Sequence, residues 1–304
     1  METSKCIAIT KNGNSCRYQQ KYGQYCGQHK AASEIIEVKK CITITYGDVC
    51  ENHVGMQKIQ GNVVTCGFSL DELQRANERF TKLGAVCELY VLGDALPTDL
   101  TMEYESAYVL IIRQGVDVLL KEIDKTSNDM MVEQETLTWD TKMLSAKHKD
   151  NGNGGVVNKL ARHNLCYAEE AQVADIANAK GTVIAFRDIP CTDYIRRKLP
   201  DLLGNLAENL VAEGNLYYDV KKCGIGWHSD LERNLVVAVR LGESMPLHFH
   251  WFYQSKPIGE MMKFILNHGD MYVMSNKTVG KDGKKRNILT VRHAAGCDKY
   301  TNLK

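Results

Sequence analysis

Two groups of residues in this 304-residue chain have the types and spacing of metal ligands. The first comprises Cys6, Cys16, Cys26 and His29, of which the last two are separated by only two residues. Three thiolates and one imidazole form a closed tetrahedral set that is typical of structural zinc. Because this segment is short of large aliphatic side chains, zinc binding would supply folding energy that a hydrophobic core cannot. We therefore predict a zinc-stapled module over residues 1–32, with chance clustering of four such residues as the alternative.

The second group is the pair His228 and Asp230, in the segment NLYYDVKKCGIGWHSDLERN of residues 215–234. Side chains at positions i and i+2 of a strand point to the same face, so the imidazole and the carboxylate would converge on one point. A second histidine from another strand would complete a set of two histidines and one carboxylate. Such a set leaves coordination positions open and is typical of non-haem Fe(II) centres that use oxygen. The HxD pair alone is weak evidence, because it also occurs in surface turns.

The elements that must position these residues follow from the spacing of apolar side chains. A helix is predicted over residues 69–83, because Ser69 and Glu72 form a capping-box pattern ahead of an apolar stripe. Strand patterns lie on both sides of it, at residues 41–46, 87–92 and 107–115. Together they predict a small α/β domain of unknown role over residues 33–126.

Short strands dominate the second half of the chain. Strand patterns occur at residues 182–186, 235–241, 247–253, 271–275 and 288–292. One helix is expected from about residue 193 to residue 211. The segment Asp150–Gly155, DNGNGG, is either a flexible spacer or a long hairpin loop. Many short strands with turns at Gly, Asn and Asp predict a β-sandwich or barrel.

Composition limits the class of protein. Hydrophobic residues make up 44% of the chain and charged residues 25%, which is typical of a globular protein and excludes a collagen or a coiled-coil rod. No apolar run is long enough to span a membrane, and the N-terminus lacks a basic start followed by an apolar core. Eleven cysteines without a secretory signal indicate a reducing intracellular compartment, the cytoplasm or the nucleus.

The charge is distributed unevenly. Residues 1–40 carry a net charge of +4 and residues 276–304 a net charge of +6, which leaves −9 for the middle of a chain whose total is +1. Basic ends suit contacts with a phosphate backbone, or they simply keep the chain soluble. The acidic middle argues against a very broad nucleic-acid surface.

The C-terminal half resembles the AlkB-type branch of the Fe(II)/2-oxoglutarate-dependent oxygenases. Four blocks carry the resemblance in order over residues 139–304: Asn215, Tyr217, Gly224, Gly226, His228, Asp230 and Glu232; the turn Leu241–Gly242; GDMYVMS at Gly269–Ser275; and RNILTVR with Arg286 and Arg292. The blocks NLC, GIGWHSDLER and RHAAG are similar to those of AlkB-like proteins of large DNA viruses, and the N-terminal segment resembles their small Cys₃His fingers. The resemblance implies an α+β protein with a double-stranded β-helix (jelly roll) over residues 127–304.

The resemblance also implies roles for particular residues. His228 and Asp230 would bind iron, and Asn215 and Tyr217 would form hydrogen bonds with 2-oxoglutarate, which is used together with O₂. The two carboxylates of 2-oxoglutarate would be bound by Arg286 and Arg292, since arginine offers a two-pronged donor that lysine lacks.

One departure from the family pattern concerns the second iron histidine. The segment SNKTVGKDGKKR, which precedes the arginine strand, contains no histidine, so the candidates are His248, His250, His268 and His293. We favour His293. If it binds iron, its neighbour Arg292 points away from the co-substrate, and Arg286 or Arg240 carries more of that role. A site with no third protein ligand is the alternative.

The resemblance implies oxidative demethylation or hydroxylation of nucleic-acid bases in an infected host cell. Lys159, Arg162, Asn164 and Tyr167 lie where the family has its nucleotide-recognition lid, although ordinary loop residues would look the same. Two other functions stay open: an inactive fold that binds nucleic acid or protein, and a protein hydroxylase. The sequence does not specify the preferred base, DNA or RNA, or the oligomeric state.

Overall fold

The computed structural model describes residue 5 and residues 15–20, 39–145 and 155–303. The chain divides into two compact units, Met1–Val38 and Lys39–Lys304.

The described part of the first unit is small. Lys5 and Gln19 form an isolated antiparallel bridge, the Gln20 side chain donates a hydrogen bond to the Lys5 carbonyl (3.0 Å), and Cys16 is buried. The other three predicted zinc ligands lie outside the described residues, so the zinc module stays a prediction.

The second unit is built on an eight-stranded sheet. In spatial order its strands are β4 (Val86–Val91), β5 (Tyr108–Arg113), β15 (Met271–Met274), β12 (Val237–Gly242), β1 (Cys41–Gly47), β10 (Val211–Tyr217), β8 (His163–Ala168) and β9 (Val183–Ala185). Every neighbouring pair is antiparallel except β8 and β9, which are parallel.

A second, four-stranded antiparallel sheet packs against the first. Its order is β11 (Gly224–His228), β16 (Thr290–Gly296), β13 (Met245–Tyr253) and β14 (Lys256–Leu266). Two separate hairpins pair β2 (Val49–Glu51) with β3 (Lys58–Gln60) and β6 (Lys142–Ser145) with β7 (Gly155–Asn158). Ser145 pairs with Gly155, but residues 146–154 between them, which include most of the DNGNGG segment, lie outside the described residues, so both interpretations of that segment stay predictions.

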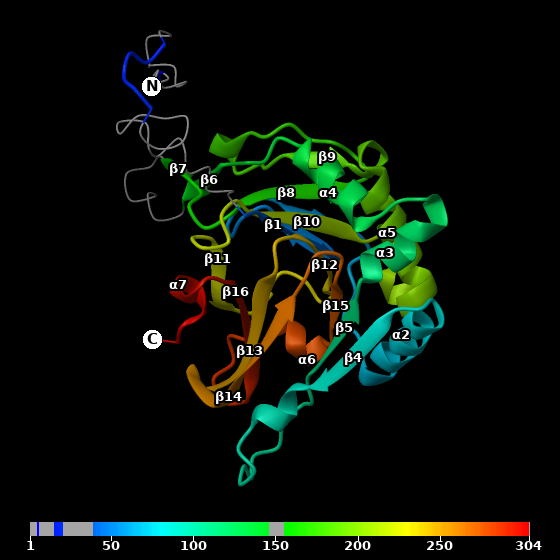
Figure 1. Cartoon of the computed structure of the whole chain (residues 1–304). Helices are drawn as coiled ribbons and strands as arrows, with labels where there is room; N and C mark the ends of the chain where they lie inside the picture. The colour runs from blue at the N-terminus through cyan, green and yellow to red at the C-terminus, as the bar shows by residue number, and fades with distance from the viewer. Residues whose placement is uncertain (1–4, 6–14, 21–38, 146–154, 304) are drawn as a thin grey trace. The chain divides into compact units, whose positions relative to one another are not determined.

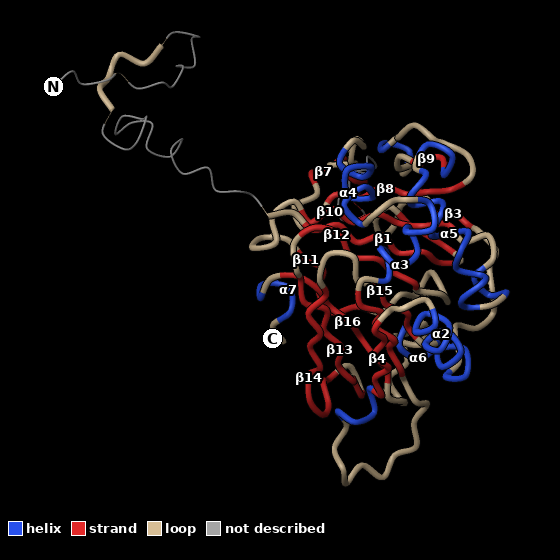
Figure 2. The backbone as a smooth tube through the Cα atoms, turned by 45° about the vertical axis from the view of Figure 1, so that its right-hand side comes forward, coloured by secondary structure: helices blue, strands red, loops and turns tan. Residues whose placement is uncertain are grey.

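The helices are short. They are α2 (Leu70–Lys82), α3 (Gly115–Leu120), α4 (Ser127–Glu135), α5 (Pro190–Leu203), α6 (Asn276–Val279) and α7 (Asp298–Thr301), with 3₁₀ turns η2 (Leu92–Ala95), η3 (Lys121–Ile123), η5 (Ile176–Asn178), η6 (Phe186–Asp188) and η7 (Asn205–Ala207). Figure 2 shows how strands outweigh helices in the second unit. The described chain is therefore a mixed α+β protein, as predicted at that level. None of its described helices has the length and hydropathy needed to cross a membrane.

The two predicted helices compare differently with the structure. The capping box is confirmed: the Ser69 hydroxyl accepts a hydrogen bond from the Glu72 amide, and the Glu72 carboxylate accepts one from the Ser69 amide. The extent of the second helix was wrong, since α5 ends at Leu203 and not near residue 211. Gly204 (φ +84°) breaks the helix, and the chain passes through a 3₁₀ turn into β10.

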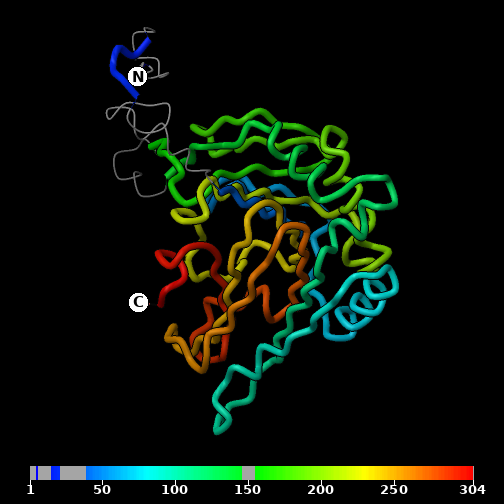
Figure 3. Tube along the Cα trace, viewed as in Figure 1, coloured from blue at the N-terminus to red at the C-terminus, as the bar shows by residue number. Residues whose placement is uncertain are grey.

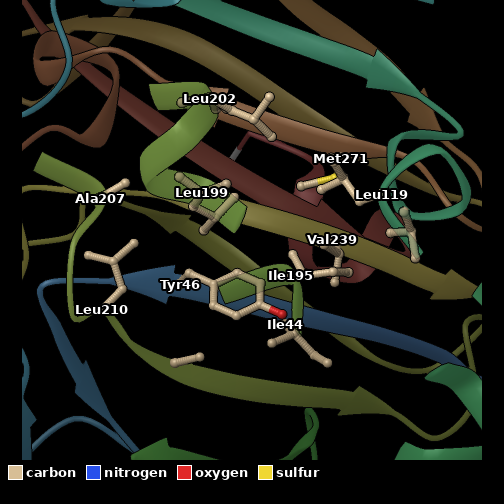
Figure 4. Close-up of a cluster of buried hydrophobic side chains, with 14 of the residues drawn as sticks. Ile44, Tyr46, Leu119, Ile195, Leu199, Leu202, Ala207, Leu210, Val239 and Met271 are labelled. Carbon is tan, nitrogen blue, oxygen red and sulfur yellow. The ribbon is translucent and has the colours of Figure 1, made fainter. Parts of the chain in front are cut away.

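Alternation along the strands produces two hydrophobic layers. Ile42, Ile44 and Tyr46 of β1 face helices α2, α3 and α5 in one layer, part of which Figure 4 shows. The opposite face of the large sheet packs against the four-stranded sheet, with residues such as Ala238 and Phe249 between them. Polar side chains that line a cavity continue this second layer.

The predicted division after residue 126 is not a boundary between compact units. Strand β1 lies in the middle of the large sheet between β10 and β12, and β4 and β5 extend the same sheet. Figure 3 shows this mixing, since early and late parts of the chain run side by side. Local sequence patterns cannot show such pairing between distant strands, so residues 33–126 only looked separate.

Candidate metal centre

Three ligand side chains meet where the end of β11 pairs with the middle of β16. His228 is the last residue of β11 and pairs directly with His293 of β16. Asp230 follows two residues later, and its amide donates a hydrogen bond to the Val279 carbonyl (3.0 Å). One Asp230 carboxylate oxygen, Oδ1, lies 3.5 Å from Nε2 of His228 and 3.7 Å from Nε2 of His293. All three ligand atoms lie within 4.8 Å of one another, close enough for one metal ion to contact them all.

The environment favours the ligand forms of these groups. Nδ1 of His228 lies 2.8 Å from the Gly226 carbonyl, which directs Nε2 toward Asp230. Burial and the neighbouring His293 lower the pKa of His228 to about 3. Burial acts to raise the pKa of Asp230, but His293 and Arg233 outweigh it and bring that pKa below its ordinary value. At neutral pH His228 is therefore neutral and Asp230 ionised, as metal ligation requires.

The other candidate histidines lie elsewhere. His248 and His250 flank the Trp227 ring, with ring centroids 6.2 and 5.9 Å from it, while Phe249 between them faces His293. His268 accepts a hydrogen bond from the Gly242 amide through Nδ1 (2.8 Å). Within the described ranges, His228, Asp230 and His293 form the one close group of potential ligands. The favoured third position, His293, therefore joins the cluster, and it does so on a regular strand.

The cluster lines a cavity of about 810 Å³ between the two sheets. The predicted co-substrate residues Asn215, Tyr217 and Arg292 line the same cavity, but Arg286 does not. Arg286 is exposed in the loop that precedes β16, because that strand begins only at Thr290. The prediction that Arg286 faces a co-substrate is therefore not supported.

Arg292 alternates with His293 along β16. Its guanidinium stacks on the Phe252 ring, 4.3 Å from the centroid, and across the sheet it pairs with His250. Its charge is therefore engaged on the face opposite to the metal ligands, as expected once His293 points inward.

The surroundings of Arg240 favour the binding of an anion. It lies on β12 directly opposite Thr43 of β1, and only 1% of its surface is exposed. Its Nη1 lies 3.4 Å from the Cys41 sulfur, but its Nε and the Thr43 hydroxyl have no hydrogen-bond partner among the described residues. Burying a cation without an anion is costly, and arginine does not lose its proton. Both residues line the cavity that contains the histidine–aspartate cluster.

Asn215 is the centre of a polar network on the cavity wall. Its side-chain oxygen accepts hydrogen bonds from Arg162 Nε (2.5 Å) and Asn164 Nδ2 (2.7 Å), and its amide donates to Glu213 (3.0 Å). Glu213 in turn pairs with the buried Arg233 at 2.6 Å. These contacts hold the wall in place and leave Asn215 with few free hydrogen-bonding positions.

The structure separates the four predicted substrate residues. Arg162 lines the cavity, whereas Asn164 is fully buried behind it. Lys159 is buried and donates to the Asn52 side chain (2.5 Å), and burial lowers its pKa to about 8. Tyr167 is completely buried with its hydroxyl on Gln134 (2.7 Å), so it supports the core and the prediction that it contacts substrate is not supported. Asn164 and Tyr167 are covered because they lie on β8, which is an interior strand of the large sheet.

The sequence did not identify the residues that the β2–β3 hairpin contributes. Glu51, His53 and Lys58 line the cavity together with the hairpin turn. The sequence offers no reason to select His53, because a lone histidine is more often structural than functional. Its position depends on where the hairpin packs, which local patterns do not reveal.

Fold and site together define a strand-rich α+β protein in which a His–Asp–His cluster lines a cavity between two sheets. No known protein-family profile matches the chain. Over 264 residues it is 42% identical to uncharacterized protein R156 of Acanthamoeba polyphaga mimivirus, an alignment that covers 87% of this chain and 98% of that protein. The chain belongs to the same protein family as this mimivirus protein.

Proposed function

We propose that this protein is an AlkB-like Fe(II)/2-oxoglutarate-dependent dioxygenase that demethylates or hydroxylates nucleic-acid bases. One observation carries the proposal: a cluster of two histidines and one carboxylate shares its cavity with Arg240, a buried cation that lacks an acidic partner among the described residues. The first feature suits a metal ion with open coordination positions, and the second suits the carboxylate of a co-substrate.

The strand order supports a jelly roll. Among the strands from β10 to β16, the large sheet contains β10, β12 and β15, and the small sheet contains β11, β13, β14 and β16. In an eight-stranded jelly roll, the eighth strand returns to the first sheet between the first and third strands. Here β1, from the beginning of the unit, occupies that place between β10 and β12. The proposed fold is therefore a jelly roll whose eighth strand comes first in the chain.

The cluster fits Fe(II). His228, Asp230 and His293 would hold the ion, and they provide the nitrogen and oxygen donors of a two-histidine, one-carboxylate face. Bound iron and 2-oxoglutarate would supply the activation of O₂ for oxidation of a C–H bond. The protein's own contribution is to orient the ligands through the Gly226 and Val279 carbonyls and to surround them with a largely buried cavity.

Of the three arginines named from the sequence, Arg240 fits the carboxylate of 2-oxoglutarate best. It is buried within the cavity, whereas Arg286 is exposed outside it and Arg292 stacks on Phe252. A carboxylate there would pair with the guanidinium and accept a hydrogen bond from the Thr43 hydroxyl, which has no other partner in the described chain. The cavity volume of about 810 Å³ leaves room for a substrate beside the co-substrate.

Turnover distinguishes this proposal from the alternatives. We expect the full chain to convert 2-oxoglutarate to succinate in an Fe(II)-dependent reaction, and to release formaldehyde from an N-methylated oligonucleotide. Asp230→Ala should abolish both. Succinate formed only with a peptide substrate would favour a protein hydroxylase. Absence of succinate from folded, iron-loaded protein supplied with these substrates would favour a binding protein.

The N-terminal zinc module is a separate part of the proposal. Cys6, Cys16, Cys26 and His29 would hold one zinc ion, and Cys26→Ser should remove it without affecting the iron site. Elemental analysis of the full chain tests this, and absence of zinc from protein with reduced, intact thiols would contradict it. The eleven cysteines support a reducing compartment, the cytoplasm or nucleus of an infected cell.

A further inference from the structure

A strongly basic loop borders the metal cavity. It spans residues 280–286, between α6 and β16, and its exposed cations are Lys281, Lys284, Lys285 and Arg286. Within the described part of the chain, none of these four has an acidic partner at ion-pair distance. The one acidic residue of the loop, Asp282, pairs with the buried Lys277 at 2.6 Å. The four positive charges are therefore available to an external anion.

This basic loop is fixed to the segment that carries the metal ligands. On the N-terminal side of the loop, the Val279 carbonyl accepts a hydrogen bond from the Asp230 amide. On its C-terminal side, the Ser229 hydroxyl donates a hydrogen bond to the Val291 carbonyl (3.1 Å). Gly283 lies so close to Ser229 that an added Cβ would come 2.1 Å from its Oγ and 2.5 Å from its Cβ. The absence of a side chain at Gly283 thus allows the loop to pack directly on the turn between His228 and Asp230.

The basic loop forms part of a positively charged rim. Gly283 and Lys284 line the cavity, and Lys58 from the β2–β3 hairpin and Arg162 from the β7–β8 connection line it from other segments. Glu213 and Glu232 share the single cation Arg233, and Glu51 accepts a hydrogen bond from the Gly55 amide. Six cationic side chains line the cavity against four carboxylates, so positive charge predominates there: Lys58, Arg162, Arg233, Arg240, Lys284 and Arg292 against Glu51, Glu213, Asp230 and Glu232.

We propose that the basic loop binds the phosphate backbone of a single-stranded nucleic acid whose base enters the metal cavity. The inference rests on the proposed function for the fate of the base, but phosphate binding itself requires no metal. Cations from three separate segments suit a chain of repeated charges. Tyr272 lines the cavity and offers an aromatic surface for a base, which an acidic peptide would not need.

Binding to metal-free, full-length protein tests the proposal. The probe is a fluorescein-labelled oligothymidylate, followed by fluorescence anisotropy over a series of salt concentrations. In the test variant Lys281, Lys284, Lys285 and Arg286 are all changed to Ala. The matched control also removes four positive charges, but from exposed residues that do not line the metal cavity. These residues, likewise changed to Ala, are Arg75, Lys82, Lys121 and Lys180. Thermal unfolding checks that both variants fold.

The salt dependence gives the expected result. Each phosphate contact to a single strand contributes roughly 0.7 to the slope of log affinity against log salt concentration. The test variant should therefore bind the oligonucleotide more weakly, and the magnitude of its slope should fall by up to about 3. The control variant should retain most of the slope of the natural protein. Lys284→Glu alone should also weaken binding, because Lys284 lies at the cavity itself.

Two outcomes would overturn the proposal. Equal weakening in test and control variants would mean that only general charge attracts the probe. Poly-glutamate that competes as well as the oligonucleotide, and through the same loop residues, would identify an acidic protein as the partner. Neither outcome affects the metal site, and an Fe(II) titration of the test variant keeps the two proposals separate, since the iron ligands are unchanged.

Discussion

The two walls of the metal cavity are built differently. On the wall from the four-stranded sheet, His228, Asp230 and His293 lie close together, and backbone carbonyls hold His228 and Asp230 in place, although Nδ1 of His293 has no hydrogen-bond partner in the described chain. On the wall from the eight-stranded sheet, Arg240 and Thr43 face the same cavity, but Arg240 Nε and the Thr43 hydroxyl lack partners in the described chain.

This difference indicates that the walls serve different ligands. The first wall presents a compact set of electron donors, which suits a cation. The second presents a fixed positive charge and a hydroxyl donor, which suits an anion. A buried polar atom without a partner destabilises the fold by about 1–3 kcal/mol, so a ligand that satisfied these atoms at the cavity surface would remove that cost.

The largest expected effect concerns the donor wall. His293→Ala should weaken Fe(II) or Co(II) binding by more than about 100-fold, because loss of even a supporting residue costs 10–100-fold. His250→Ala is the matched control, since that histidine is also buried but contacts Trp227. Calorimetric titration of both variants provides the measurement. If His250→Ala loses the metal and His293→Ala retains it, the ligand assignment is wrong.

The next effect concerns the anion wall. Arg240→Ala should weaken 2-oxoglutarate binding to metal-loaded protein by roughly 30-fold or more, which corresponds to about 2 kcal/mol or more for a buried charged contact. Arg292→Ala should have little effect, because that guanidinium lies over Phe252. Metal affinity, measured separately, should not change in either variant. A larger loss in Arg292→Ala would reverse the assignment.

Much of the donor wall could be predicted from the sequence, whereas the anion wall could be predicted only in part, since Arg240 was named as an alternative to Arg286 and Thr43 was not named. The i, i+2 spacing of His228 and Asp230 is visible locally, and His293 follows from its place after a strand pattern. Arg240 lies in the apolar strand VAVRLG and becomes significant only when β1 pairs with β12. That pairing joins distant parts of the chain, which local periodicity cannot show.

The same reason explains the errors in the predicted fold and site. Arg286 was expected on a strand because RNILTVR has a strand composition, yet the loop extends to Thr290. Tyr167 was expected in a lid, yet β8 lies between β10 and β9 in the large sheet. The local pattern located the strand near Arg286 almost correctly, whereas the strand that contains Tyr167 was not predicted. In both cases the neighbours in space decided the role of the side chain.

A buried lysine offers a contrast with Arg240, because lysine can release its proton. Burial lowers the pKa of Lys159 to about 8, below its ordinary 10.5, so the unfolded chain binds this proton more tightly than the folded chain. As pH rises from about 8 toward 10.5, stability should increase relative to Lys159→Met, by at most about 1.4 kcal/mol per pH unit. Urea unfolding of both proteins across this range is the test. A constant difference would show that Lys159 has an ordinary pKa.

The smallest effect concerns the hydroxyl of the anion wall. Thr43→Val should leave the free protein equally stable or about 1 kcal/mol more stable, because the buried Thr43 hydroxyl lacks a partner in the described chain. The same change should reduce the stabilisation produced by 2-oxoglutarate. Thermal unfolding with and without the co-substrate measures both. A marked loss of stability in the free protein would mean that the hydroxyl has a structural role.

The most direct test of the central claim is an anaerobic titration of Fe(II)-loaded protein with 2-oxoglutarate, followed through the visible iron-to-co-substrate charge-transfer band. The account predicts a band in the natural protein, none in Asp230→Ala, and one in Arg240→Ala only at much higher 2-oxoglutarate concentrations. A band that persists unchanged in Asp230→Ala, or its absence from the natural protein, would contradict the claim that this cavity joins a metal site to a carboxylate site.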